Sequence, residues 1–454
     1  MFGVLAGCSA RVPGANTGAP ASTASARLET QLDEAMRLTE RGYGVAGIAV
    51  GVWLKGQPLL VRGYGLADVL QGVPVRTDHI FRIGSITKTF TAVAIARLAA
   101  QQKLSITDPV ARHLPALGLD KRITLRHLLS HTSGIPSYTE LPSHAEQMHE
   151  ALTAAQLLAQ FAGLPLKFEP GSEHAYSNSG YYLLGLVIEK VSGQSYADFL
   201  RTEAYAPAGL TETGYCPDAQ NYPDAALGYV RTSGALGPAR PLSMTQPFAA
   251  GALCSSANDL LRWFDALSHG KLVSAEAYAA MSAPTELNSG QRHNYGLGLS
   301  IGDLEGHARV GHSGGINGFA TDVSYYPRDE LLIVVLVNTE GSPPSGIVEK
   351  LARIVLDLQE PSVLDLPITA EEAAPVTGSY EVRELGQLIT IFLDGDHLRL
   401  GRAGQPGGLR LRSQGNGIYA VPELDARLNF ELEGGEVKRM IVRQRGQRFI
   451  GQRK

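Results

Sequence analysis

The chain has 454 residues, and its 40 lysines and arginines against 44 aspartates and glutamates give a formal net charge of −4 at pH 7. Hydrophobic residues make up 44% of the sequence and charged residues 19%, a balance that is typical of globular proteins and excludes a largely disordered chain. The small net charge offers no field for a phosphate backbone, so we expect no nucleic-acid partner, and no apolar run reaches the roughly 18 residues that a membrane span needs.

The N-terminal segment differs in composition from the rest of the chain. The sequence L-A-G-C that ends at Cys8 has the form of a bacterial lipobox, and Ser9 to Ala26 is rich in small residues, as flexible tethers are. The residues before Cys8 include no lysine or arginine and are fewer than an export signal needs, so an apolar N-terminus without an anchor is the alternative. We predict a lipoprotein-type signal remnant and tether over residues 1–26, a membrane tether through lipidated Cys8, and a periplasmic or lipid-anchored location in the bacterial cell envelope.

Helical and strand patterns alternate over the next part of the chain. Strands are predicted at residues 45–54, 58–65, 307–312, 319–326 and 331–337, and amphipathic helices at 27–41 and 347–358. Between them, the stretch from Thr87 to about Leu267 is mostly helical. This order predicts an α+β domain over residues 27–360, in which terminal helices flank an antiparallel sheet and an all-helical lobe is inserted, with a cleft between the lobes.

A change in composition marks the C-terminal part. Residues 361–375 form a linker that carries proline and glutamate, and residues 376–454 contain short alternating segments separated by turn dipeptides. One hairpin is predicted around Asp394-Gly395 and another around Gly434-Gly435. We therefore predict a small antiparallel β-barrel as the last domain.

The remaining cysteines, Cys216 and Cys254, admit two interpretations. In an oxidising compartment they could form a disulfide. They could equally be two small buried hydrophobic residues. The sequence leaves both alternatives open.

The first motif whose residues could take part in catalysis is S-I-T-K, from Ser85 to Lys88. It places an amine one helical turn beyond a hydroxyl, on the same helix face. A second S-x-x-K, from Ser268 to Lys271, straddles a predicted helix end, so its lysine lies outside the helix. Ser85 instead precedes an apolar helical pattern over Thr87 to Leu98, where the positive end of the helix dipole stabilises developing negative charge. The plainer alternative is a capping serine followed by a surface lysine.

Two further motifs lie downstream. Tyr176-Ser177-Asn178 places two polar side chains on a predicted turn, where one can accept a proton and the other can orient a substrate carbonyl. The sequence G-H-S-G-G from Gly311 to Gly315 also satisfies G-x-S-x-G, the nucleophile elbow, but an elbow needs a helix next and two strands follow here. We expect instead a glycine-rich strand edge that lets a substrate backbone approach and presents N–H groups to an oxyanion.

In order and spacing, these motifs resemble the serine β-lactamase and DD-peptidase superfamily, in particular its class C-like branch of penicillin-binding proteins, carboxypeptidases and esterases. The resemblance runs from about Arg27 to Glu360. It also includes L-L-S-H-T-S-G from Leu128 to Gly134, the stretch from Pro170 to Gly180, and Gly251 to Ser255 with Asp259. Some members carry lipocalin-like appendages, which the C-terminal β domain resembles.

The resemblance implies a role for each motif. Ser85 is implied to be the acylated nucleophile, and Lys88 and Tyr176 its proton-handling partners. The implied substrate-binding residues are Asn178, His312, Ser313 and Gly314, of which the last three stand where many relatives carry Lys-Thr-Gly. The backbone N–H groups of Ser85 and Gly315 are the implied oxyanion hole. A histidine of ordinary pKa is mostly neutral at pH 7, so His312 weakens the expectation of true β-lactamase activity and leaves peptide or ester hydrolysis open.

The expected function is therefore that of a serine hydrolase. It would form an acyl-enzyme with an amide or ester: a D-amino-acid peptide, a β-lactam or a small ester. The alternative is a penicillin-binding sensor or sequestering protein that is acylated without turnover. We expect a small-molecule or peptide substrate and no cofactor, and the oligomeric state stays open. His127 and His131 have the spacing of zinc ligands but lack the glutamate of H-E-x-x-H, so we expect no metal site.

Overall fold

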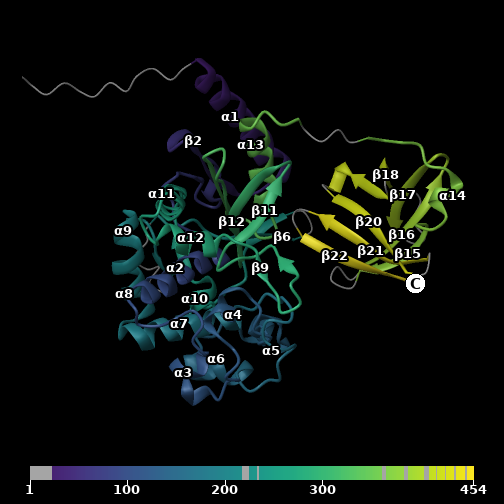
Figure 1. The fold of residues 1–454 in the computed structure, drawn as a ribbon. Helices are drawn as coiled ribbons and strands as arrows, with labels where there is room; N and C mark the ends of the chain where they lie inside the picture. Colours follow the sequence, from purple (N-terminus) through teal and green to yellow (C-terminus); the bar gives the residue numbers. More distant parts are fainter. Residues whose placement is uncertain are drawn as a thin grey trace, which may run out of the picture.

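The computed structural model describes residues 23–216, 224–232, 235–359, 364–382, 387–402, 408–415, 417–424, 426–433, 436–444 and 447–454. The predictions for Cys8 and for the Gly434-Gly435 turn lie outside these residues. Figure 1 shows a larger region of mixed helices and strands and a barrel of strands toward the C-terminus. In the described ranges, no helix is both long and apolar enough to cross a bilayer.

A seven-stranded antiparallel sheet forms the centre of the larger region. Its order is β11–β12–β13–β14–β1–β2–β3, so strands from the two ends of this region meet where β1 pairs with β14. In this pairing Ile48 lies opposite Val337 and Leu54 opposite Leu331. The strands are β1 (Gly47–Leu54), β2 (Gln57–Asp68), β3 (Val73–Pro74), β11 (Ser300–Leu304), β12 (His307–Ile316), β13 (Phe319–Tyr326) and β14 (Leu331–Val337).

Both faces of the sheet are buried at β14, which explains the uninterrupted apolar run of that strand. Leu332, Val334 and Leu336 pack into the core shared with the helical lobe, whereas the alternate residues pack into the core shared with the terminal helices. Helix α11 (Ala257–Ser268) covers the first face, and α1 (Thr23–Tyr43) and α13 (Pro344–Val355) cover the second. The sheet, its terminal helices and the inserted lobe confirm the predicted fold class.

The helical lobe is built around α2 and α7. Phe90 of α2 stacks on Trp263 of α11 with ring centroids 3.8 Å apart, and the Nε1–H of Trp263 donates to Oγ1 of Thr89 over 3.0 Å. Thr91 donates to the carbonyl oxygen of Ala249 over 2.7 Å, so these threonines are paired although they are buried. The elements of the lobe are η1 (Gly84–Ile86), α2 (Thr87–Ala100), α3 (Val110–His113), η2 (Pro115–Leu117), α4 (Leu125–Leu129), η3 (Tyr138–Glu140), α5 (Pro142–Gln147), α6 (Ala154–Phe161), α7 (Asn178–Ser192), α8 (Tyr196–Leu200), η4 (Arg201–Tyr205), α9 (Ala206–Ala208) and α10 (Phe248–Gly251).

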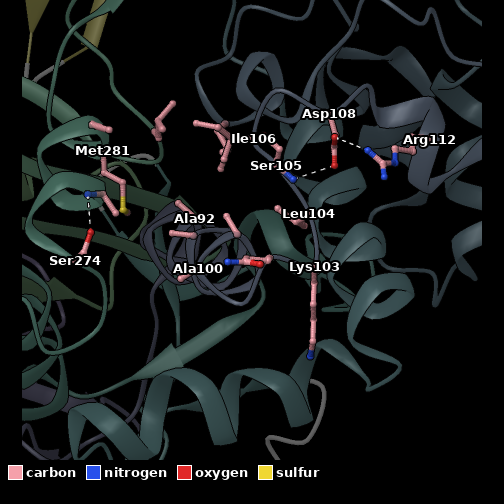
Figure 2. Close-up of a pocket in the computed structure, with 17 residues that line it drawn as sticks. Ala92, Ala100, Lys103, Leu104, Ser105, Ile106, Asp108, Arg112, Ser274 and Met281 are labelled. Carbon is pink, nitrogen blue, oxygen red and sulfur yellow. Dashed lines mark hydrogen bonds and ion pairs between the residues drawn. The ribbon is translucent and has the colours of Figure 1, made fainter.

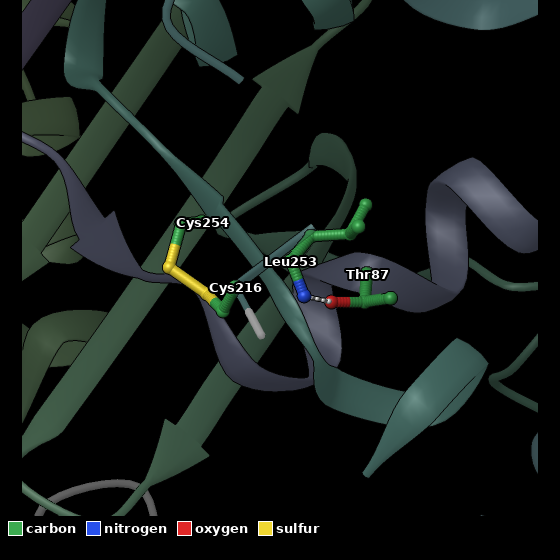
Figure 3. Close-up of a disulfide and its surroundings, with 4 residues drawn as sticks. All are labelled: Thr87, Cys216, Leu253 and Cys254. Carbon is green, nitrogen blue, oxygen red and sulfur yellow. Dashed lines mark hydrogen bonds between the residues drawn. A yellow bond between two sulfur atoms is a disulfide. The ribbon is translucent and has the colours of Figure 1, made fainter. Parts of the chain in front are cut away.

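A disulfide holds a small sheet against the start of α2. Cys216 and Cys254 are bonded, with their Cα atoms 5.4 Å apart, which decides between the two alternatives that the sequence left open. The sheet has the order β4 (Phe81–Arg82), β8 (Leu253–Ser255), β5 (Gly214–Tyr215), and Cys254 lies on its central strand. Next to Cys254, the N–H of Leu253 donates to Oγ1 of Thr87 over 3.1 Å (Figure 3). The disulfide therefore ties β8, the strand that contacts the first turn of α2, to the residue that directly follows β5.

The C-terminal strands close into a barrel, as predicted. Its core contains Tyr380, Ile391, Leu398, Leu428 and Met440, all essentially inaccessible to solvent. The strands are β15 (Gly378–Val382), β16 (Gln387–Asp394), β17 (His397–Arg402), β18 (Leu409–Gly415), β19 (Ile418–Val421), β20 (Ala426–Glu433), β21 (Glu436–Gln444) and β22 (Gln447–Arg453). The remaining elements are β6 (Tyr229–Thr232), β7 (Ala235–Pro238), α12 (Ala275–Met281), β9 (Thr285–Glu286), β10 (Arg292–His293), α14 (Ala370–Ala373) and η7 (Pro422–Leu424).

Candidate active site

Ser85 lies on a tight turn between β4 and α2. This turn is η1, and α2 begins directly after it at Thr87. Gly84 has a φ of +50°, and a Cβ at this position would lie 3.0 Å from the carbonyl oxygen of Gly315. Glycine therefore allows both the left-handed backbone and the close approach of η1 to β12. This approach brings Ser85 and Gly315, which are far apart in the sequence, to one place.

Lys88 lies one turn along α2 and is fully buried. Its Nζ is 3.0 Å from Oγ of Ser85, 2.8 Å from Oδ1 of Asn178 and 2.8 Å from the carbonyl oxygen of Ala250. An ammonium can donate to all three oxygens. A neutral amine can donate its two N–H bonds to Asn178 and Ala250, which leaves its lone pair directed at the Ser85 hydroxyl.

Burial decides the protonation of this lysine. Desolvation holds the pKa of Lys88 well below its usual value of 10.5. The rings of Tyr176 and Tyr181 act in the opposite direction, because their faces attract a cation and their centroids lie 4.8 and 5.4 Å from Nζ. Within the described ranges no carboxylate forms an ion pair with Lys88, so we take desolvation as the dominant effect. The amine can then accept a proton near neutral pH.

The start of α7 orients Asn178. Ser177 caps this helix by accepting a hydrogen bond from the N–H of Gly180, and the N–H of Asn178 donates to Oγ of Ser137 over 3.0 Å. The Nδ2 of Asn178 donates to Oγ1 of Thr139 over 3.0 Å. The amide nitrogen is therefore held by Thr139, and the amide oxygen is the atom that faces Lys88.

Tyr176 extends from the segment just before α7. Although 36% of its surface is exposed, its ring lies beside Lys88, and desolvation raises the pKa of the phenol above its usual value of 10.0. A hydrogen-bonding interaction with Ser85 lowers that pKa but does not offset the burial. The opposite shifts of Lys88 and Tyr176 favour a neutral amine beside a neutral phenol.

The glycine-rich motif lies inside β12. The strand predicted to end at His312 continues to Ile316, because residues 310–316 pair in register with β13. Along this part of the strand Ser313 and Gly315 are exposed, whereas His312 and Gly314 are buried. The chain then turns directly into β13, which agrees with the rejection of the nucleophile elbow.

The side chain of His312 points into the protein and is 5% exposed. Its Nδ1 lies 2.6 Å from the carbonyl oxygen of Ser313 and therefore carries the proton, and its Nε2 then accepts from the hydroxyl of Tyr295 over 2.9 Å. Burial and the nearby Lys88 lower the pKa of His312 to about 3. His312 is thus neutral at physiological pH and supplies no cation for a substrate carboxylate.

A cavity of about 650 Å³ lies elsewhere, along α2 (Figure 2). Small side chains of that helix, among them Ala92, Ala96 and Ala100, leave the space, and Leu104 and Met281 contribute to its apolar wall. Its lining includes none of the residues that the sequence predicted for the site. We therefore place the candidate active site at Ser85 and not in this cavity.

Other residues of the site were not assigned from the sequence. They include the carbonyl of Ala250, Thr139, Tyr181 and Tyr295, which no local motif marks. His131 was noted for its spacing from His127 and as part of L-L-S-H-T-S-G, without a role of its own. The two side chains accept from different backbone N–H groups, His131 from that of Ser177 and His127 from that of Thr124. Within the described ranges, no group of three or more His, Cys, Asp or Glu residues is placed to hold a metal ion. The second S-x-x-K lysine, Lys271, lies beyond the end of α11.

Comparisons with known proteins agree with this geometry. The family model described as Beta-lactamase matches residues 26–357. Penicillin-binding protein 4* of Bacillus subtilis is 30% identical over 73% of this chain and 78% of its own length. Among solved structures, an octameric penicillin-binding protein homologue from Pyrococcus abyssi has a TM-score of 0.68 at 26% identity, covering 93% of this chain and 99% of that one. A D-stereospecific amidohydrolase from Streptomyces sp. has a TM-score of 0.61 at 28% identity, covering 71% and 97%.

Proposed function

Because the chain belongs to the Beta-lactamase family, whose model matches residues 26–357, we propose that it is a serine hydrolase in which Ser85 forms an acyl-enzyme. The observation that carries this proposal is the fully buried amine of Lys88, 3.0 Å from Oγ of Ser85. A serine is a weak nucleophile unless a neighbouring base takes its proton. Desolvated Lys88 is such a base.

In acylation, Oγ of Ser85 attacks the substrate carbonyl carbon while its proton passes to the neutral amine of Lys88. The carbonyl oxygen becomes an oxyanion, which the N–H groups of Ser85 and Gly315 stabilise. Tyr176 then gives its phenolic proton to the leaving nitrogen or oxygen and takes the proton held by Lys88. The bond to the leaving group breaks, and the acyl group remains on Ser85.

Deacylation reverses the proton path. Water gives a proton to the pair of Lys88 and Tyr176 and attacks the ester carbonyl, and Oγ of Ser85 regains that proton as the acid leaves. Because the two groups interact closely, the pair titrates together and its apparent pKa values belong to both. A base available to take a proton from water, here the neutral amine of Lys88 acting with Tyr176, favours turnover over stable acylation.

The substrate class that we propose is an amide or ester of a D-amino acid that does not need a free carboxylate for binding. Neutral His312 supports this choice, because it cannot form an ion pair with a carboxylate near pH 7. The Streptomyces relative is named a D-stereospecific amidohydrolase, which supports a D-amino-acid amide as the acyl donor. β-Lactams and small esters are the other acyl donors to compare.

We also propose that the protein acts in the bacterial cell envelope. The disulfide between Cys216 and Cys254 supports an oxidising compartment, because reducing compartments keep thiols free. Lipidation at Cys8 would tether the protein there. Fractionation of the producing cells with labelled palmitate tests this, and a soluble, unlabelled protein in the cytoplasm would contradict it.

Intact-mass spectrometry after exposure to a fluorophosphonate tests the acyl-enzyme. We expect one adduct on the wild type and none on Ser85→Ala, with Ser268→Ala as the matched control that labels normally. A wild type without an adduct would refute the nucleophile. A time course with a D-amino-acid p-nitroanilide then separates two outcomes: continued release indicates an enzyme, and a burst that stops at one equivalent indicates a sensor that is acylated without turnover.

A further inference from the structure

His131 holds the Tyr176 segment by three separate contacts. Its backbone carbonyl accepts from the N–H of Ala175 over 3.0 Å, and its Nδ1 accepts from the N–H of Ser177 over 3.1 Å. Its imidazole ring also lies against the phenol ring of Tyr176, with centroids 4.1 Å apart and an interplanar angle of 35°. The residues on both sides of Tyr176 and its own ring are thus all fixed by one residue.

The backbone of His131 adopts an uncommon conformation to make these contacts. Its φ is +58°, which most side chains avoid, and it lies just beyond the last turn of α4. Only 1% of the residue is exposed, because the rings of Tyr181 and Tyr295 pack around the imidazole at 5.1 and 4.8 Å. Strained backbone of this kind persists only where the surroundings hold it, and it is concentrated at functional sites.

The imidazole contributes to the site without carrying a proton to or from it. Since Nδ1 accepts a hydrogen bond, the neutral ring carries its proton on Nε2, which is buried and has no hydrogen-bond partner among the described residues. Desolvation is the main cause that holds the pKa of His131 well below 6.5. Protonation of Nδ1 would also break the bond to Ser177.

We propose that His131 is a positioning residue that fixes the phenol of Tyr176 for proton transfer at Ser85, through the two backbone contacts that flank Tyr176 and the contact between the two rings. This inference rests on the proposed function, because it assigns His131 a role through Tyr176. Proton transfer demands heavy-atom distances of about 2.6 to 3.2 Å, so a small displacement of the phenol is costly. A displacement of about 1 Å can slow a reaction about 100-fold.

Two substitutions separate the contacts. His131→Asn keeps an acceptor near the position of Nδ1 and suits a positive φ, but it removes the ring. His131→Phe keeps a ring and removes the acceptor. His127→Phe is the matched control, because His127 also accepts a backbone N–H, that of Thr124, but has no contact with Tyr176. All three variants are first checked for folding by thermal unfolding.

The decisive measurement is the acylation rate constant, in the wild-type and Tyr176→Phe backgrounds. We expect His131→Phe to lower it about 10- to 100-fold without changing substrate binding, His131→Asn to lower it less, and His127→Phe to leave it unchanged. With Tyr176→Phe already present, the same His131 substitutions should cost less than about 2-fold, because no phenolic proton remains to be positioned. An equal loss in both backgrounds would overturn the proposal and leave a purely structural role.

A second readout does not depend on catalysis. With tyrosines labelled at Cζ with ¹³C, the signal of Tyr176 is assigned by its absence in Tyr176→Phe. We expect His131→Phe to shift or broaden that signal, and His127→Phe to leave it unchanged. An unchanged signal in His131→Phe would overturn the proposed positioning of Tyr176 by His131, even where Ser85 labels normally. Failure of the wild type to label at Ser85 would instead refute the proposed function, while this signal would still decide the role of His131.

Discussion

Replacing Asn178 with aspartate tests whether the neutral amine of Lys88 is the base. The substitution keeps the shape of the side chain and places a negative charge where Oδ1 now lies, 2.8 Å from Nζ. At an effective dielectric constant of about 20, two unit charges at this separation attract by about 6 kcal/mol. With about 1.4 kcal/mol per pKa unit, this corresponds to at most about four units of increase in the pKa of Lys88.

The new carboxylate would also be desolvated, which reduces the gain, so we expect a shift of about two units. A higher pKa leaves less neutral amine at pH 7, and acylation there should fall by up to about 100-fold. The rate should recover as the pH rises, because the ammonium of the variant is deprotonated at higher pH. The position of the acidic limb of the rate profile is therefore more informative than the loss at one pH.

The assay is the acylation rate constant from pH 5 to pH 10, followed by stopped-flow release of p-nitrophenol from an activated ester. Asn429→Asp introduces the same charge on β20 of the barrel and serves as the matched control. An acidic limb that stays in place in a folded Asn178→Asp variant would refute the assignment of Lys88 as the base. A limb that moves equally in both variants would indicate a general effect of charge.

Three further predictions concern stability and local geometry. Replacing both Cys216 and Cys254 with serine should lower the free energy of unfolding by up to about 4 kcal/mol in urea titrations, since the disulfide spans 38 residues, and added reductant should then have no further effect. Gly84→Ala should lower the acylation rate at least about 10-fold, because its Cβ would lie 3.0 Å from the carbonyl oxygen of Gly315 at a φ of +50°, and a normal rate would contradict the close approach. Burial lowers the pKa of His312 to about 3, so below about pH 6.5 the unfolded chain binds more protons than the folded one, and the free energy of unfolding decreases as the pH falls toward 3. His312→Gln should therefore make the decrease between pH 7 and pH 5 about 2 kcal/mol smaller in urea titrations. An unchanged decrease would show that His312 is protonated in the folded protein.

Elements with strong local patterns were predictable from the sequence. The strands predicted at 319–326 and 331–337 have the same bounds in the structure, because their apolar and β-branched residues favour strands in any buried sheet. The helix after Ser85 begins at the predicted Thr87 for a similar reason, since an alanine-rich apolar stretch from Ala92 to Ala96 lies in its middle. By contrast, β12 extends beyond His312 through S-G-G, which has low strand propensity, because pairing with β13 holds it.

The residue types that could react, and their order along the chain, follow from the amino-acid sequence alone. Ser85 and Lys88 are three positions apart in two consecutive helical elements, η1 and α2, so their proximity follows from local helical geometry alone. The protonation states of these residues depend instead on how the folded chain packs around them. Exclusion of water lowers the pKa of Lys88 and keeps His312 neutral. The position of Tyr176 depends on contacts with His131, which lies more than forty positions away. Desolvation and long-range contacts arise only when separate segments pack together, which no local pattern encodes.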